Sequence, residues 1–434
     1  MGHGHSTDDV ASLGQAPRTR RALVVAVGAC ALATLVGLIA LWPRGPEPRL
    51  AIFNEASELV DVSITDVRQV ACVGSNPDDG LICEEIRFEV TGGSTEGDTG
   101  SIELALDSGL PELEPGDDAV FNYFDQGPEE FRYSYADFQR STPLLALAGL
   151  FALAVVLLGR LQGVRALLGL IVSLAVLVVF LLPALLQGSS PLAVALVGAA
   201  SIAFLALYLA HGVNQRTTVA LLGTLTSLVL TVGLAVVFVA LTRLTGLADE
   251  DAAFLDITAG QVDLRGLLLA GIVIGTLGVL DDVTVTQVSA VSEIHAAAPG
   301  AEPRRIYLAA LRVGRDHIAS TVNTLVLAYA GAALPLLILL SVANQRSLGQ
   351  ILSSEVVAVE IVRTLVGSIG LVASVPITTA LAVAVIAGVR REEAEPDPVV
   401  EAGPRSPNPP PDPRPPPPAA DPDWDDFTPR QEDW

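Results

Sequence analysis

The chain has 434 residues, of which 51% are hydrophobic and 17% are charged, and its formal net charge is −23 at pH 7. Its mean hydropathy of +0.52 is too high for one soluble domain and indicates a membrane protein. The charge is uneven: residues 44–142 contain 22 acidic and 6 basic residues, and residues 390–434 contain 12 acidic and 5 basic residues. Because the acidity belongs to these two soluble segments, it argues against nucleic acid as a partner.

The N-terminal segment, residues 1–21, ends in a run of arginines and precedes an apolar stretch at 22–42. The stretch could be a signal peptide, but it is long for one and no small-residue cleavage site follows it. We therefore expect an uncleaved first transmembrane helix with the N-terminal segment in the cytoplasm.

Residues 44–142 contain about five short stretches of alternating polar and apolar residues, separated by turn sequences such as NPDDG and EPGDD. This pattern predicts a small extracytoplasmic β-barrel of OB or SH3 type. Cys72 and Cys83 lie in this segment with ten residues between them, and an oxidising exterior favours a disulfide between them. Cys30 lies in the first apolar stretch and is expected to be a small core residue.

Long apolar runs predict an α-helical polytopic protein with about eight transmembrane helices, since about 20 apolar residues span a bilayer. The expected spans are residues 22–42, 143–160, 164–186, 191–210, 217–242, 266–286, 317–342 and 365–389. Arginines mark alternate loops, which places both chain termini in the cytoplasm of a bacterial cell and residues 44–142 outside. Residues 143–389 then form a seven-helix core. The acidic, Pro-rich tail of residues 390–434 is expected to be disordered and could dock a protein partner.

The sixth expected span carries polar residues at helical spacing. Asp282, Thr286, Ser289 and Glu293 are separated by four, three and four positions, so they share one helix face, and Asp281 lies beside that face. Polar groups within a span must contact protein or water rather than lipid. We therefore expect Asp282 to face the protein interior. The competing interpretation is a helix that simply emerges into the cytoplasm at this point.

The seventh expected span begins with a second polar face, which contains Asp316, Ser320 and Asn323 together with Arg312. Stripes on two spans predict either a functional polar cavity or structural hydrogen bonds between helices. In a cavity, the acids would bind a cation or carry protons, while Thr286, Ser320 and Asn323 would be neutral ligands.

The sequences of residues 137–170, 275–294 and 314–338 resemble the YibE/F family in its actinobacterial form. The resemblance covers roughly residues 130–390, and its most specific part is the block of Gly275, Gly278 and Asp282 followed by Glu293. It implies a multi-pass bacterial membrane protein, for which a transport role is supposed. Many members carry one aspartate where this chain has Asp281 and Asp282, so the resemblance does not distinguish the two.

Three functions remain open from the sequence. The polar faces favour a transporter or channel-like protein for a cation or a proton-coupled small solute. The ectodomain and tail favour a non-transporting sensor or assembly factor. A membrane metallohydrolase using Glu293, His295 and His317 is disfavoured, because these residues lack the spacing of a zinc motif. We expect neither enzymatic activity nor a cofactor, and no metal is specified.

Overall fold

The computed structural model describes most of the helical region and most of residues 44–142, the β-rich segment that the sequence predicts to be extracytoplasmic and that is named the ectodomain for this reason. The described residues are 17–45, 58–72, 82–105, 112–125, 128, 131–248, 250–258, 262–342 and 347–393. Residues 1–16 and the tail beyond Glu393 lie outside them, so the predictions for those segments have no structural counterpart here.

The ectodomain is a five-stranded antiparallel half-barrel, which confirms the predicted number of strands and their β-barrel-like character. Its strands are β1 (Glu58–Ala71), β2 (Ile82–Gly92), β3 (Thr99–Ala105), β4 (Asp118–Tyr123) and β5 (Tyr133–Phe138). They lie in the order β3-β2-β1-β4-β5, and the two edge strands β3 and β5 also contact each other. The sheet therefore curves towards closure, which shortens its exposed edges.

Alternation of side chains along the strands builds the ectodomain core. Val60, Val62 and Ile64 on β1 are each at most 2% exposed, as expected when every second residue faces inward. Phe88 on β2 packs edge-on against Phe121 on β4, with ring centroids 4.7 Å apart. This aromatic contact joins strands on both sides of β1 and so holds the sheet curved.

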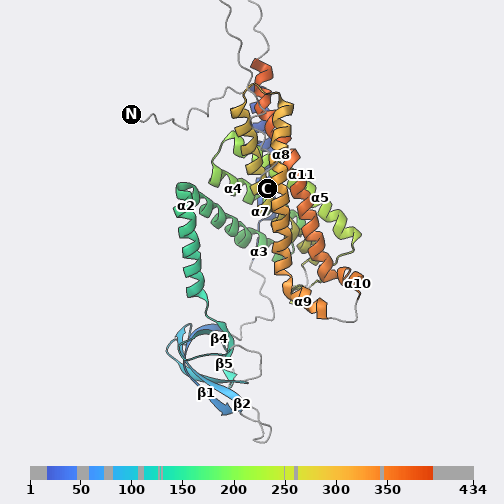
Figure 1. Cartoon of the computed structure of the whole chain (residues 1–434). Coiled ribbons are helices and arrows are strands. Elements are labelled where there is room, and N and C mark those ends of the chain that lie inside the picture. Colours follow the sequence, from blue (N-terminus) through green and yellow to red (C-terminus); the bar gives the residue numbers. More distant parts are fainter. Residues whose placement is uncertain are drawn as a thin grey trace, which may run out of the picture. The chain divides into compact units, whose positions relative to one another are not determined.

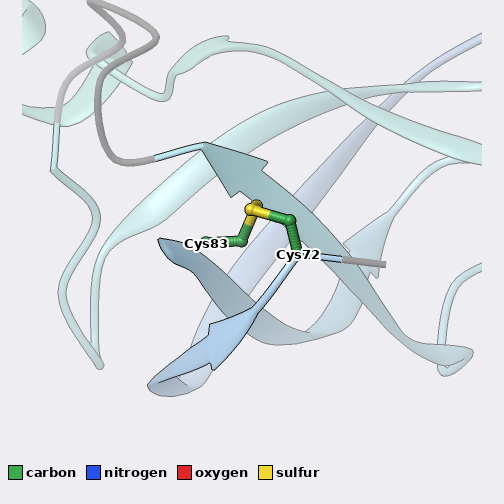
Figure 2. The surroundings of a disulfide bond; sticks show 2 residues. All are labelled: Cys72 and Cys83. Carbon is green, nitrogen blue, oxygen red and sulfur yellow. A yellow bond between two sulfur atoms is a disulfide. The ribbon is translucent and has the colours of Figure 1, made fainter. Parts of the chain in front are cut away.

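A disulfide joins Cys72, just after β1, to Cys83 on β2, with 5.0 Å between their Cα atoms (Figure 2). Val70 and Ala71 pair with Cys83 and Ile82, so the two strands already lie side by side at this end. The bond therefore closes the hairpin, and Cys30 on the first helix is the free cysteine among the described residues.

Helices make up the rest of the described chain (Figure 1). They are α1 (Pro17–Leu41), α2 (Ser141–Val176), the π-helix η5 (Leu177–Leu181), α3 (Leu182–Leu186), α4 (Pro191–His211), α5 (Gln215–Leu241), α6 (Glu250–Thr258), α7 (Leu264–Ala297), α8 (Pro303–Ala332), α9 (Leu334–Val342), α10 (Leu348–Leu352) and α11 (Glu355–Glu393).

Six helices among the described residues are long and apolar enough to cross a membrane, where the sequence predicted eight spans. Two predicted spans, 143–160 and 164–186, lie in one helical run of 46 residues, Ser141–Leu186. At 1.5 Å per residue a straight helix of this length would be roughly 70 Å long, more than twice the bilayer core. Arg160, with φ of 50°, breaks it, and Figure 1 shows α2 changing direction sharply. The two predicted spans are therefore its two arms.

The predicted span 317–342 is also revised. It falls on two helices, because α8 ends at Ala332 and α9 begins at Leu334, next to Pro335. Proline lacks the backbone N–H that would continue the helical hydrogen bonds. The first part of α8 carries Arg312, Arg315 and Asp316, so α8 does not reach the apolarity of the six candidate spans.

The interior of the helical region centres on α7, which contacts α4, α5 and α8 and bonds to α11. One apolar cluster joins α4, α5 and α7, and a second joins α5, α7, α8 and α11. The neighbours of α7 thus determine which of its faces is covered, and this decides the positions of the candidate site residues.

Candidate functional site

The polar stripe predicted on the sixth span lies on the outer face of α7. Asp282, Thr286, Ser289 and Glu293 are all exposed, and the side chains of Asp282 and Glu293 are 72% and 74% exposed. The prediction that Asp282 faces the protein interior is therefore wrong. The reason is that α4, α5, α8 and α11 cover the other faces of α7.

The same face of α7 continues towards the helix start with small residues. Gly271, Gly275 and Gly278 are exposed and precede Asp282 at spacings of four, three and four positions. This face therefore carries no large apolar side chain from Gly271 to Glu293, a composition unsuited to lipid contact.

The second predicted stripe borders the first. On α8, the residues of this stripe are exposed: Asp316, Ser320 and Asn323. His317 of α8 contacts the α7 stripe, because its Nε2 atom lies 3.9 Å from Oδ2 of Asp282. The structure thus brings the two predicted stripes together along the α7–α8 contact. They form one exposed polar face rather than an enclosed cavity.

Asp281 is partly buried, and it is covered more than its exposed neighbour Asp282. Its Oδ1 atom is fully enclosed and has no hydrogen-bond partner among the described residues. Asp281 shares its helix face with Ile274 and Val285, seven positions before it and four after it. Both of those residues pack against the cluster of α4, α5 and α7. Asp281 therefore points towards the junction of these three helices.

A cavity of about 170 Å³ lies one helical turn from Asp281. Val285 and Val288, which share the face of Asp281, line it from α7. Its polar lining comes from the end of α4, from the start of α5 and from the middle of α7. The polar residues are His211, Asn214, Arg216, Thr217 and Ser289. The charge of Arg216 is paired with Glu293, with 3.6 Å between Nη1 and Oε1. This cavity lies beside the helix face that holds Asp281, and Asp281 itself is not among its lining residues.

Buried hydroxyl groups surround α7 on its other inner faces. Thr284 places its Oγ1 atom 2.7 Å from Oγ1 of Thr224 on α5, and the same atom donates to the carbonyl of Asp281. The buried amide of Gln287 donates to the carbonyl of Ala310 on α8 and to Oγ1 of Thr379 on α11. These bonds link α7 to three neighbouring helices.

Three further buried hydroxyl groups have no hydrogen-bond partner among the described residues: those of Ser227, Ser368 and Thr378. Thr378 lies against a glycine, because a Cβ atom added at Gly223 would be 2.5 Å from its Oγ1. Such glycines let α5 and α11 approach closely and leave little free volume at the contact. The buried hydroxyls between α5 and α11 therefore belong to a packed interface.

Within the described part of the chain, no group of three or more His, Cys, Asp or Glu side chains is placed so that it could hold a metal ion. His317 lies beside Asp282, whereas Glu293 pairs with Arg216. The three residues of the disfavoured metallohydrolase are therefore not brought together as a set.

The family model described as YibE/F-like protein matches residues 147–388, which is more than half of the chain. The chain belongs to the YibE/F-like family. No curated protein and no solved structure matches it.

The matched region of this YibE/F-like protein includes every helix from α4 to α8, and with them the buried polar groups around α7. The actinobacterial form of the family stays a prediction. The sequence had already singled out the Asp281–Asp282 pair, but it missed Thr224, Gln287 and Thr379. These polar residues interrupt apolar runs, and that was the signal available for finding them.

Proposed function

We propose that this YibE/F-like protein moves a small cation, or a solute coupled to protons, across the bacterial cell membrane, and that Asp281 binds the cation or proton. The observation that carries the proposal is the enclosed, unpartnered Oδ1 atom of Asp281. A carboxylate oxygen that is enclosed without a partner is costly, and the cost is relieved when the group takes up a proton or a cation.

Two further observations support this role for Asp281. The fully buried polar side chains of the described helices are hydroxyls and one amide, so none of them is a basic group that could pair with the carboxylate of Asp281. The 170 Å³ cavity lies one helical turn along the same face of α7, where Val285 and Val288 line it. In this proposal a rearrangement of the helices opens the cavity to the carboxylate, which is then loaded and unloaded from that side.

The proposal is tested by flux through purified protein reconstituted into lipid vesicles, with an entrapped pH-sensitive dye. Protons are the first probe, followed by external Na⁺ or K⁺ at constant pH. We expect Asp281→Asn to lower the flux more than about tenfold, since it removes the charge but keeps the size of the side chain. Asp282→Asn is the matched control, because the adjacent carboxylate is exposed, and it should keep the flux within about twofold.

Equal incorporation of the two variants is checked by quantifying protein in the vesicles. Normal flux in Asp281→Asn, or equal loss in both variants, would reject Asp281 as the carrier. The absence of flux of any of these ions through the wild-type protein would reject this choice of transported ion.

A second candidate function, a sensor or assembly factor, is favoured by the exposed polar face of α7 and α8. In a bilayer this face needs water or a protein partner. The half-barrel ectodomain offers another partner surface, and its neighbour order, with β1 between β2 and β4 and with β3 beside β5, fits a barrel of OB type.

Cysteine accessibility distinguishes the two environments of the polar face. In a Cys30→Ser background, Thr286→Cys should react with a charged, membrane-impermeant thiol reagent if water covers the face. Protection from the reagent, combined with crosslinking to another protein, would instead support the assembly function. The transport proposal is tested separately, by the flux through Asp281→Asn, because Asp281 points about 100° around the helix from Asp282 of the stripe.

A further inference from the structure

A second cavity, with a volume of about 460 Å³, lies against the start of α7, from Leu264 to Ile274. Its other walls come from η5, α3, α6, α11 and the loop after α5. Apart from Asp251 and Arg363, every lining residue is apolar or glycine. The arginine distribution predicts this end of α7 to be extracytoplasmic. The volume lies in the range of small-molecule sites, so the cavity has room for a hydrated ion.

The charged residues of this larger cavity favour a cation. The guanidinium of Arg363 donates to Oε1 of Glu360 at 2.8 Å, so its charge is already paired. The remaining charge among the described lining residues is the carboxylate of Asp251, which is exposed on α6. A carboxylate beside low-dielectric walls attracts cations and repels anions. The larger cavity therefore has the sign of charge that the proposed function requires.

Both cavities lie against the same face of α7. Gly271 and Ile274 line the larger cavity. Val285 and Ser289 line the smaller cavity of 170 Å³. Spacings of three, eleven and four positions place these residues on one side of the helix. The eleven positions between the cavities correspond to about 16 Å of helix, and Asp281 lies within this interval.

The interval between the two cavities is open at Gly278. A Cβ atom at Gly278 would meet nothing within 4 Å, and the same holds at Gly271. Gly278 is exposed and lies seven positions after Gly271 and three before Asp281, so the three residues follow one another along the helix face. The two glycines therefore leave space along α7 from the larger cavity to the carboxylate.

We propose that the cation or proton enters through the larger cavity, passes along α7 over Gly278 and reaches Asp281, from which the smaller cavity leads to the other side. This inference rests on the proposed function and adds the route to it. Because the two cavities are separate, a rearrangement of helices has to join them, and passage is controlled at Gly278. The π-helix η5 forms part of the wall of the larger cavity, and such turns are frequent at functional sites.

The route is tested first without measuring flux, by thiol accessibility in a Cys30→Ser background. In vesicles that contain the full-length protein, Gly278→Cys should react with a cationic, membrane-impermeant thiol reagent at least about tenfold faster than Gly233→Cys, because a thiolate forms in water and not in lipid. Gly233 is the matched control: it too has nothing within 4 Å of its Cβ position, but it shares its face of α5 with exposed Val229 and Val237. Equal rates would overturn the proposal.

The entrance is tested by the charge of the reagent. At low ionic strength Gly271→Cys should react at least about threefold faster with a cationic reagent than with an anionic one of the same size. Asp251→Asn should bring this ratio close to one. Asp256→Asn is the control, because Asp256 is exposed on α6 but does not line the cavity, and it should keep the ratio. A ratio that Asp251→Asn leaves unchanged would contradict this entrance.

Flux then separates the route from the carrier. Gly278→Leu should lower the flux more than about tenfold at equal protein content, while Gly233→Leu should keep it within about twofold, since only the first side chain fills the route. Normal flux in Gly278→Leu would reject the route, whatever Asp281→Asn shows. Loss of flux in Gly278→Leu with normal flux in Asp281→Asn would reject the carrier and keep the route. If the wild type moves none of the probe ions, the accessibility of Gly278→Cys still decides the route.

Discussion

Gly223 of α5 lies directly against Thr378 of α11: a Cβ atom at Gly223 would be 2.5 Å from Oγ1 and 3.1 Å from Cγ2 of the threonine. Both residues are fully inside the helical bundle, and Thr378 is 0% exposed. The contact therefore sets the distance between two helices on either side of the candidate site.

Gly223→Leu should separate α5 from α11 and lower the amount of folded protein in the membrane. Overpacking of a tight contact typically costs about 1–3 kcal/mol, and here the neighbouring atoms belong to a β-branched side chain with little freedom. Gly233→Leu, on the same helix but exposed and with nothing within 4 Å of its Cβ position, should leave the amount unchanged. Thermal unfolding of the detergent-solubilised proteins measures both effects, and equal melting temperatures would contradict the close contact.

Gln287→Leu should destabilise the bundle by about 1–3 kcal/mol, because it removes the amide that bonds to α8 and α11 and leaves the Thr379 hydroxyl without that partner. The replacement has a similar volume, so packing changes little. Thr286→Val one residue earlier is the control, since its exposed hydroxyl bonds only within its own helix. A denaturation midpoint for Gln287→Leu that equals that of Thr286→Val would mean that the amide contributes nothing to the folded state.

The disulfide predicts a simple labelling pattern. Under denaturing, non-reducing conditions a thiol reagent should modify Cys30 and leave Cys72 and Cys83 unmodified. Chain-entropy arguments give the bond about 3 kcal/mol of stabilisation for a loop of this length. Reduction should therefore lower the unfolding midpoint of the ectodomain. Mass spectrometry that finds three labelled cysteines without reductant would rule out the bond.

Topology is the fourth prediction. The arginine distribution places residues 44–142 outside the cell and residues 390–434 inside. Protease added to intact spheroplasts should therefore cleave the ectodomain and spare the Pro-rich tail, as detected with an epitope at the C-terminus. Cleavage of the tail in sealed cells would require an even number of crossings after the ectodomain.

The sequence by itself determined the membrane character, the approximate positions of most spans and the strand content of the ectodomain. These features follow from local composition and periodicity, which the chain carries without reference to its fold. The pairing of Cys72 with Cys83 was also predictable, because they are the two cysteines of one segment that the sequence predicts to be extracytoplasmic. The count of spans was less secure, since a break at Arg160 or Pro335 changes how many helices one apolar run contains.

Only the tertiary structure decided which face of α7 is buried. The helix carries polar residues on both sides: Thr284 and Gln287 face its neighbours, while Asp282 and Glu293 face away. Periodicity identifies a polar stripe on a helix but not which neighbouring helices cover it. It therefore could not tell which of Asp281 and Asp282 is the more buried. Adjacent residues on a helix point about 100° apart, and the packing of α4 and α5 selects the side of Asp281. The choice depends on contacts between residues far apart in the sequence, such as Thr224 and Thr284, 60 positions apart, which no local pattern encodes.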